Sequence, residues 1–336
     1  MTSYKDIQRL TGLSLSTISK YYNGRTVLEE NRRAIEEAAE RLGFRPNDVA
    51  RNLRSGRSRT VGVLLPALTN NFHLTIIGGV ERALHEAGLS VLVAASPSAE
   101  SGAVDLLLGR MVDGIITVPP AHDVAALARA AGTVPVVQVD WQAEGLVSDG
   151  VFLDNRGAGA TAARLLLDHG HRRVGVLAGD PSVSTLRDRA AGFHAELLTS
   201  GIERDAALAP AGGYAVADGH AAMRAVLAAR PRPTAMFCAT YELTLGALIA
   251  LNESGVRLGR DLSLIGFDCR DLALATLPRL TYIEQPTPEI ATRAAELILA
   301  RLDAGGPDSG GAAPAPVHAA VDPVFVAGSS VLRVDE

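Results

Sequence analysis

The sequence predicts an α/β protein in which a small three-helix helix-turn-helix domain precedes a larger body of two doubly wound parallel-sheet subdomains. The chain has 336 residues, more than one hydrophobic core normally holds, so two or three domains are expected. Residues 1–59 show helical spacing of their apolar residues, whereas strand-like apolar runs alternate with helical stretches from residue 60 onward. The charge divides at the same place, with a net +5 over residues 1–59 and a net −10 over residues 60–336.

The composition argues against several classes of protein. Although 47% of the residues are hydrophobic, no apolar run approaches the roughly 18–20 residues that span a bilayer, and the first residues lack the apolar stretch of a signal peptide. We therefore expect a cytoplasmic protein without a membrane partner. Cys238 and Cys269 end apolar runs and show no metal-ligand spacing, so we expect buried free thiols, no metal site and no cofactor.

Two short helices are predicted near the N-terminus. Ile7 and Leu10 lie three residues apart, and Ile18 and Tyr22 four apart, so each pair shares one face of a helix. Between the pairs, Gly12 permits a tight turn.

A third helix is predicted by apolar residues at the spacing i, i+3, i+4, i+7, namely Ile35, Ala38, Ala39 and Leu42. Gly43 can end it. Three such helices with a tight turn between the first two form a helix-turn-helix unit, whose second helix enters the major groove of DNA. The polar outer face of residues 15–22 therefore indicates a DNA-contacting surface, although their charge alone would favour a merely solvated face.

The stretch PNDVARNLRSG, residues 46–56, predicts a further short helix. Pro46 suits its start, Val49 and Leu53 share a face, and Gly56 follows its end. The stretch is shorter than the roughly 12–15 residues that an isolated helix needs in water, so we expect it to be marginal without a partner. The alternative is a plain interdomain linker whose Leu53 packs on the body. We assign residues 1–45 to the helix-turn-helix domain and residues 46–59 to the hinge helix and linker.

The body, residues 60–336, contains nine strand-like apolar runs separated by helical stretches. These runs are TVGVLLP, LSVLVAA, DGIITV, VPVVQVD, DGVFLD, RRVGVLAGD, TAMFCAT, LSLIGFD and LTYIEQ. Near-continuous apolar strands between helices indicate parallel sheets covered on both faces. The set divides near Val151 into two similar halves, which is typical of a periplasmic-binding-protein-like fold. The helix after Gln285 is expected to cross back to the first half, and residues 305–317 to form a surface loop.

We therefore expect a first subdomain from residues 60–152 and 286–304, and a second from residues 153–285 and 318–336. Ligands of such sheets bind at the carboxyl ends of the strands. The side chains expected there are Asn70, Asn71, Phe72, Asp140, Phe152 and Asp268. Arg189, in the stretch SVSTLRDRAAG, could donate two hydrogen bonds to one ligand. For a single strand-end aspartate, however, a helix cap is the more usual role.

Two segments, YKDIQRLTGLSLSTISKYYNG and RPNDVARNLRSGRSRTVGVLLP, resemble the lactose-repressor (LacI/GalR) family of bacterial transcription regulators. The resemblance continues over essentially the whole chain. The chain departs from the family at Gln8 and Thr11, where alanines usually pack the first helix on the second. The resemblance implies operator DNA and a second copy of the chain as partners, and it makes Leu53 a wedge for the minor groove. The DNA-contacting residues that it implies are Ser3, Leu15, Ser16, Ser19, Lys20, Asn23, Asn47, Arg51, Leu53 and Arg54.

The resemblance also implies a small-molecule effector between the two subdomains. The effector-binding residues that it implies are Asn71, Phe72, Asp140, Phe152, Arg189, Tyr214, Thr240, Asp268 and Gln285. Carboxylates, an arginine and aromatic rings together suit a polyhydroxyl ligand, so a sugar is expected first. Thr240 and Tyr241 stand where the family commonly has an Asn-Asp pair, which removes hydrogen-bonding capacity and leaves a less hydroxylated effector as the alternative.

A different class of function is suggested by Gly157, Gly159 and Ala162, whose spacing matches a dinucleotide-binding fingerprint, with Asp180 at the distance of a ribose-binding acid. Against it, Asp154, Asn155 and Arg156 separate the strand from the first glycine, so the tight turn is missing, and Asp154 would place a carboxylate near the expected pyrophosphate. No other catalytic motif is present, and a secreted solute-binding protein would need a signal peptide. We therefore expect a non-enzymatic, ligand-responsive repressor. It would bind a two-fold operator as a dimer, because one helix-turn-helix unit reads only a half-site. The resemblance implies tetramers only where a C-terminal heptad segment is present, and the final SSVLRVDE shows no such repeat.

Overall fold

The structure is a computed structural model that describes residues 2–22, 25–44, 57–305 and 315–334. The chain forms two compact units, residues 1–58 and residues 59–336, and each unit is described by itself. Among the described residues, no helix combines the length and the apolar character that crossing a bilayer requires.

The first unit contains the three predicted helices, α1 (Tyr4–Thr11), α2 (Leu15–Tyr22) and α3 (Glu29–Leu42). Each helix contributes to one small core through Ile7, Ile18 and Ile35, which are fully buried. Tyr4 stacks on Tyr22 with a ring-centroid distance of 5.3 Å and adds an aromatic layer to this core. The helical periodicity therefore predicted the domain correctly, although Leu10 is 45% exposed and does not join the core.

Local hydrogen bonds set where these helices begin and end. The Asp6 carboxylate accepts from both the backbone N–H and the hydroxyl of Ser3, at 2.9 and 2.8 Å, which fixes the start of α1. Gly12 adopts a left-handed φ of 70° and turns the chain toward α2. The Thr11 hydroxyl donates to the carbonyl of Ile7 one turn earlier, at 2.8 Å, so this polar side chain finds its partner within α1.

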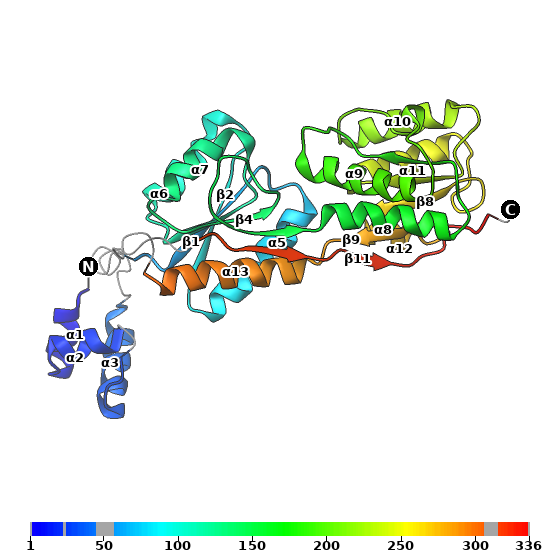
Figure 1. The fold of residues 1–336 in the computed structure, drawn as a ribbon. Coiled ribbons are helices and arrows are strands. Elements are labelled where there is room, and N and C mark those ends of the chain that lie inside the picture. The colour runs from blue at the N-terminus through cyan, green and yellow to red at the C-terminus, as the bar shows by residue number, and fades with distance from the viewer. Residues whose placement is uncertain (1, 23–24, 45–56, 306–314, 335–336) are drawn as a thin grey trace. The chain divides into compact units, whose positions relative to one another are not determined.

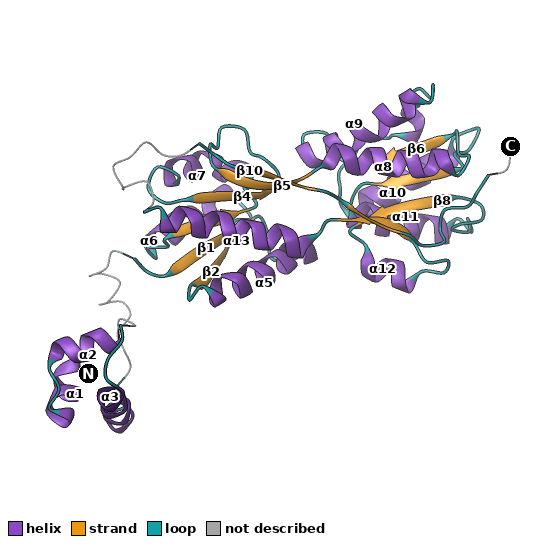
Figure 2. Ribbon diagram, turned by 60° about the horizontal axis from the view of Figure 1, so that its bottom comes forward, coloured by secondary structure: helices purple, strands orange, loops and turns teal. Residues whose placement is uncertain are grey.

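The second unit contains two sheets (Figures 1 and 2). The first sheet has the order β10-β5-β4-β3-β1-β2, and all its neighbouring strands are parallel. Its strands are β1 (Thr60–Leu65), β2 (Ser90–Ala95), β3 (Gly114–Thr117), β4 (Val136–Asp140), β5 (Asp149–Leu153) and β10 (His318–Val321).

Helices cover both faces of the first sheet. One face packs against α5 (Asn71–Glu86) and α13 (Thr287–Asp303), which lie side by side in Figure 1. The other face packs against α6 (Ala103–Gly109) and α7 (Val124–Ala130). Short 3-10 turns occur at Ala99–Ser101 and Ala121–Asp123. This arrangement explains why the strands are apolar on both faces, as their sequences indicated.

The second sheet has the order β11-β9-β8-β7-β6. Its strands are β6 (Val174–Leu177), β7 (Ala235–Cys238), β8 (Ser263–Phe267), β9 (Thr281–Glu284) and β11 (Val324–Val326), the last of which is antiparallel to β9. Its helices are α8 (Asn155–Asp168), α9 (Ser184–Thr199), α10 (Val216–Ala228), α11 (Tyr241–Glu253) and α12 (Arg270–Ala275), with a 3-10 turn at Ala206–Leu208. The first two of these helices cover one face of the sheet, and the next two cover the other. Cys238 and Cys269 are buried free thiols, as predicted.

The chain crosses between the two sheets three times, after β5, after β9 and after β10 (Figure 2). All nine apolar runs form strands, and α13 returns to the first sheet as expected. The sequence-based assignment of residues 318–336 to the second subdomain was wrong for β10. This strand pairs in parallel with β5 at the edge of the first sheet, so the last crossing falls between Val321 and Val324.

Candidate functional site

The carboxyl-end loops of both sheets surround one cleft of about 1270 Å³. The first half lines it with residues from the loops after β1, β2, β3 and β4, and the second half with residues after β6, β7, β8 and β9. Eight of the nine side chains predicted for the effector site line this cleft: Asn71, Phe72, Asp140, Arg189, Tyr214, Thr240, Asp268 and Gln285. Of these side chains, the strand-end rule had indicated Asn71, Phe72, Asp140 and Asp268, and the family resemblance had added Tyr214, Thr240 and Gln285.

Phe152 is the predicted site residue that the structure does not bring to the cleft lining. It lies within β5, and its ring packs edge-on against His318 of β10 at a centroid distance of 5.4 Å. Successive strand residues point to opposite faces of a sheet, so proximity to the carboxyl end of β5 did not determine where this ring points.

Arg189 is the most constrained charged group of the cleft. Its side chain is buried, Nε donates to Oδ1 of Asn155 at 2.7 Å, and Nη1 donates to the carbonyl of Ala239 at 2.7 Å. The guanidinium carbon lies 3.6 Å from the ring centroid of Phe267, a cation–π contact. Burial lowers the pKa of Arg189 from its ordinary value, while the carboxylates of Asp268 and Asp140 oppose that shift. The protein thus holds a desolvated guanidinium in one fixed orientation.

Close packing between α8 and α9 positions this arginine. A Cβ on Gly159 of α8 would lie 1.9 Å from the carbonyl oxygen of Arg189, and a Cβ on Gly192 of α9 would lie 1.9 Å from that of Arg156. Each helix therefore uses a glycine to admit the backbone of the other. Because Asn155 begins α8 and Arg189 lies on α9, this contact also sets the hydrogen bond between their side chains.

Two aspartates occupy equivalent places in the two sheets. Asp140 ends β4 and Asp268 follows β8, and both adopt the left-handed backbone conformation, with φ of 74° and 49°. Burial raises the pKa of each carboxyl to about 6, against the opposing charge of Arg189. Asp268 also accepts from the backbone and side-chain N–H groups of Gln285, at 2.8 and 2.7 Å. Each sheet therefore presents one carboxylate close enough to Arg189 to interact with its charge.

Two of the predicted polar residues act as helix caps. Asn70 accepts from the backbone N–H of Phe72 at 2.8 Å and starts α5. Thr240 accepts from the backbone N–H of Leu243 at 3.1 Å and starts α11. Capping occupies these two side chains and limits the hydrogen bonds that they can offer to a ligand.

The strand-end rule missed several cleft residues. They are His73, Ser96, His122, Trp141, Thr185, Glu242, Arg270 and Glu284. Arg270 and Glu284 form a two-pronged ion pair at 3.0 and 2.9 Å, so their charges largely compensate. Glu242 follows the Thr240-Tyr241 departure already noted in the sequence, and that signal could have indicated it. His73 lies inside a helix, and the sequence carried no separate signal for it.

The structure gives the dinucleotide-like glycines another role. The Asp154 carboxylate accepts from the backbone N–H of Gly157 at 2.8 Å and caps α8, so the helix N-terminus that would hold a pyrophosphate already has an anion. Gly159 packs on α9, as described above. Asp180 accepts from the backbone N–H of Ser182 at 2.8 Å, a turn contact. These residues therefore favour helix packing over nucleotide binding.

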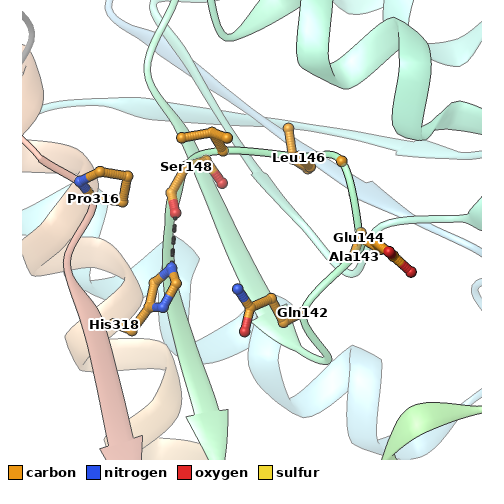
Figure 3. A pocket seen from close by; sticks show the side chains of 9 residues that line it. Gln142, Ala143, Glu144, Leu146, Ser148, Pro316 and His318 are labelled. Carbon is orange, nitrogen blue, oxygen red and sulfur yellow. Dashed lines mark hydrogen bonds between the residues drawn. The ribbon is translucent and has the colours of Figure 1, made fainter.

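A second, smaller hollow of about 410 Å³ lies beside residues 142–148, with Pro316 and His318 on its other side (Figure 3). His318 Nε2 lies 3.2 Å from the carbonyl oxygen of Ser148 and links β10 to this loop. Among the described residues that line this hollow, Glu144 alone is charged, and no arginine or aspartate contributes as in the large cleft. Within the described ranges, no group of three or more His, Cys, Asp or Glu side chains could hold a metal ion.

In the first unit, the predicted DNA-contacting residues of α2 lie on its outer face. Leu15, Ser16 and Lys20 are exposed, whereas Ile18 between them is buried in the core. Ser19 is half-buried, and Ser3 is used in the start of α1. The remaining predicted contacts, Asn23, Asn47, Arg51, Leu53 and Arg54, lie outside the described residues.

Comparison with known proteins identifies relatives along most of the chain. Residues 163–331, half of the chain, match the family described as "Periplasmic binding protein-like domain". The HTH-type transcriptional repressor PurR of Photobacterium profundum is 29% identical over 308 residues, which cover 90% of this chain and 92% of that protein. The ribose operon repressor of Haemophilus influenzae is 29% identical over 306 residues, with the same coverage.

Solved structures give the same result. A lac repressor dimer bound to operator and the anti-inducer ONPF superposes with a TM-score of 0.84 and 25% identity, covering 98% of this chain and 99% of that chain. The transcriptional regulator CelR in complex with cellobiose gives a TM-score of 0.73 and 27% identity, covering 98% and 100%. A LacI-family regulator from Enterococcus faecium with bound ribose gives a TM-score of 0.69 and 25% identity, covering 82% and 100%.

Proposed function

Because the chain belongs to the LacI/GalR family of transcription regulators, we propose that it is a repressor whose operator affinity responds to a sugar bound in the cleft of its body. Two copies would bind a two-fold operator, since one helix-turn-helix unit contacts only a half-site. The protein would act on DNA in the cytoplasm and without a catalytic step.

The observation that carries the effector half of this proposal is the placement of Arg189 with Asp140 and Asp268. A sugar hydroxyl both donates and accepts hydrogen bonds, so adjacent hydroxyls suit one fixed guanidinium and two carboxylates from opposite sheets. Phe72 and Tyr214 also line the cleft and offer apolar surface to the faces of a sugar ring. Two relatives of known structure hold cellobiose and ribose, which supports the same ligand class.

The DNA-binding part of the proposal rests on the exposed face of α2. Leu15 offers an apolar contact for a thymine methyl, Ser16 offers a hydroxyl that can donate or accept, and Lys20 suits guanine or phosphate. Similarity to a repressor bound to its operator supports this assignment.

Effector binding would act by changing how closely the two halves of the body approach. The chain joins them at three crossings. A ligand that contacts Asp140 in the first half and Asp268 in the second has a higher affinity for the body at one degree of closure than at another. A ligand shifts such an equilibrium only by its difference in affinity for the two states.

The test uses the full chain and a duplex selected from a random pool for tight binding. Titrations of this duplex are compared without sugar and with ribose, cellobiose and other neutral sugars, using fluorescence anisotropy. We expect at least one sugar to change the operator dissociation constant by about 5-fold to 150-fold, the usual range of allosteric coupling. No selected duplex would contradict the regulator assignment, and selection without any sugar response would contradict the effector assignment.

A further inference from the structure

The unpaired charge of the cleft lining is negative. Glu242, in the first turn of α11, is half-buried, and its carboxylate forms no ion pair or hydrogen bond with the described residues. Asp140, Asp268 and Asp271 also line the cleft, whereas Arg270 is paired with Glu284. Among the described arginines and lysines that line the cleft, Arg189 alone remains to balance these carboxylates, and it already donates to Asn155 and Ala239. A phosphate dianion on a ligand would therefore bring negative charge close to carboxylates that no cation balances, in a space partly shielded from water.

The buried polar atoms without a partner support the same conclusion. Among the described residues that line the cleft, these atoms are Nδ1 of His73 and Oε1 of Gln285. His73 and Gln285 are 9% and 4% exposed, so bulk water does not reach most of either side chain. Gln285 Oε1 is an acceptor by its chemistry.

His73 has an unpartnered Nδ1 on a ring that is neutral at pH 7, because burial lowers the pKa of the imidazole below its ordinary value. A neutral imidazole carries one N–H and one lone pair, and Nδ1 is the nitrogen without a partner. Oε1 of Gln285, and Nδ1 of His73 when the ring proton is on Nε2, are therefore buried acceptors without a donor. A ligand hydroxyl group can donate to such an atom, whereas a phosphate dianion in the same place offers only acceptors.

His73 and Glu242 come from different halves of the body, yet the charge of Glu242 acts on the imidazole of His73. Glu242 is therefore near the plane where the two halves approach each other. A ligand that bridges the halves passes close to this carboxylate, and closure around it would reduce the water that screens the charge.

We propose that the cleft selects an uncharged, hydroxyl-bearing ligand and rejects its phosphorylated form, and that Glu242 is the residue that determines this selectivity. The inference rests on the proposed function and specifies the class of effector within it.

The experiment measures binding of paired probes to the full chain by titration calorimetry. The probes are a neutral sugar, chosen from ribose, cellobiose and related sugars by the largest rise in melting temperature, and the monophosphate ester of that same sugar. We expect the neutral sugar to bind at least about tenfold more tightly than its monophosphate, and Glu242→Gln to reduce this ratio by about fivefold or more by removing one charge. Glu296→Gln, which removes an exposed carboxylate from α13, is the matched control and should leave the ratio unchanged.

Ionic strength gives a second measurement that needs no variant. Salt screens repulsion between partly exposed charges, so the affinity for the monophosphate should rise between low and high salt, while the affinity for the neutral sugar should change little. A monophosphate that binds as tightly as the neutral sugar would overturn the inference and leave a sugar-class effector standing. A ratio unchanged by Glu242→Gln would overturn the role of Glu242. A chain that binds neither form would overturn the proposed effector together with this inference.

Discussion

The guanidinium of Arg189 interacts with the carboxylates of Asp140 and Asp268, and these interactions dominate the electrostatics of the cleft. The arginine lowers the pKa of both Asp140 and Asp268, yet burial outweighs it and both pKa values rise to about 6. The raised pKa values therefore show that desolvation in the cleft has a larger effect on these two carboxyls than the nearby positive charge. Such perturbed carboxyls commonly mark functional sites.

Asp140 gives a pH prediction with a definite sign. Its pKa rises from 3.8 to about 6 on folding, so between these values the native state holds a proton that the unfolded chain has lost. Stability must then fall as the pH rises through this window, and it becomes constant above it. Asp140→Asn removes the titration and retains a residue that tolerates the left-handed φ of 74°.

Urea unfolding of the wild type and of Asp140→Asn from pH 4 to pH 7 tests this expectation. The free energy of unfolding of the wild type should decrease relative to that of the variant over the window set by 3.8 and about 6. A constant difference between the two proteins across that range would show that the carboxyl titrates normally.

At the scale of the element, burial explains what could be predicted from the sequence. The nine strands and three N-terminal helices were predictable because apolar periodicity reflects which face of an element is covered. The sheet to which β10 belongs could not be predicted, because the sequence of a four-residue edge strand does not indicate which strand it pairs with. Phe152 was misplaced because the strand-end rule ignores which face a side chain occupies. Glu242 and His73 were missed because the sequence does not indicate which first-turn side chains of a helix face the cleft.

The α8–α9 contact yields a second prediction. Gly159→Ala would place a Cβ 1.9 Å from the carbonyl oxygen of Arg189, so the two helices must separate. Overpacking of this kind costs roughly 1–3 kcal/mol of stability, more than the ~1 kcal/mol that alanine contributes through helix propensity. Displacement of Arg189 should also weaken effector binding.

The matched control is Gly78→Ala, within α5, where an added Cβ meets no atom within 4 Å. Thermal and denaturant unfolding should show Gly159→Ala destabilised, and Gly78→Ala unchanged or slightly stabilised. Equal stabilities for both variants would contradict the close helix contact.

For the whole molecule, the cleft lies in the second compact unit and the predicted DNA-contacting helix in the first. Effector affinity and effector-free DNA affinity should therefore be separable by mutation. Arg189→Ala is expected to abolish the sugar response while changing effector-free operator affinity by less than about twofold, because only differential contacts transmit coupling.

Anisotropy titrations with and without sugar measure both quantities in one experiment. Arg187→Ala, which removes an exposed arginine from the same helix, serves as the control and should respond like the wild type. A persistent response in Arg189→Ala, with melting confirming a folded body, would move the effector site elsewhere.

The three crossings between the sheets also set an order for biosynthesis. Apart from the edge strand β11, every strand of the second sheet lies between residues 174 and 284, so this half is contiguous as it leaves the ribosome. The first half begins at residue 60 but waits for α13 and β10, near residues 287–321, to cover one face and complete its edge. Domains generally fold as units during synthesis. The half that is translated first is therefore covered only after most of the second half has been made, and until then its apolar face stays exposed on the nascent chain.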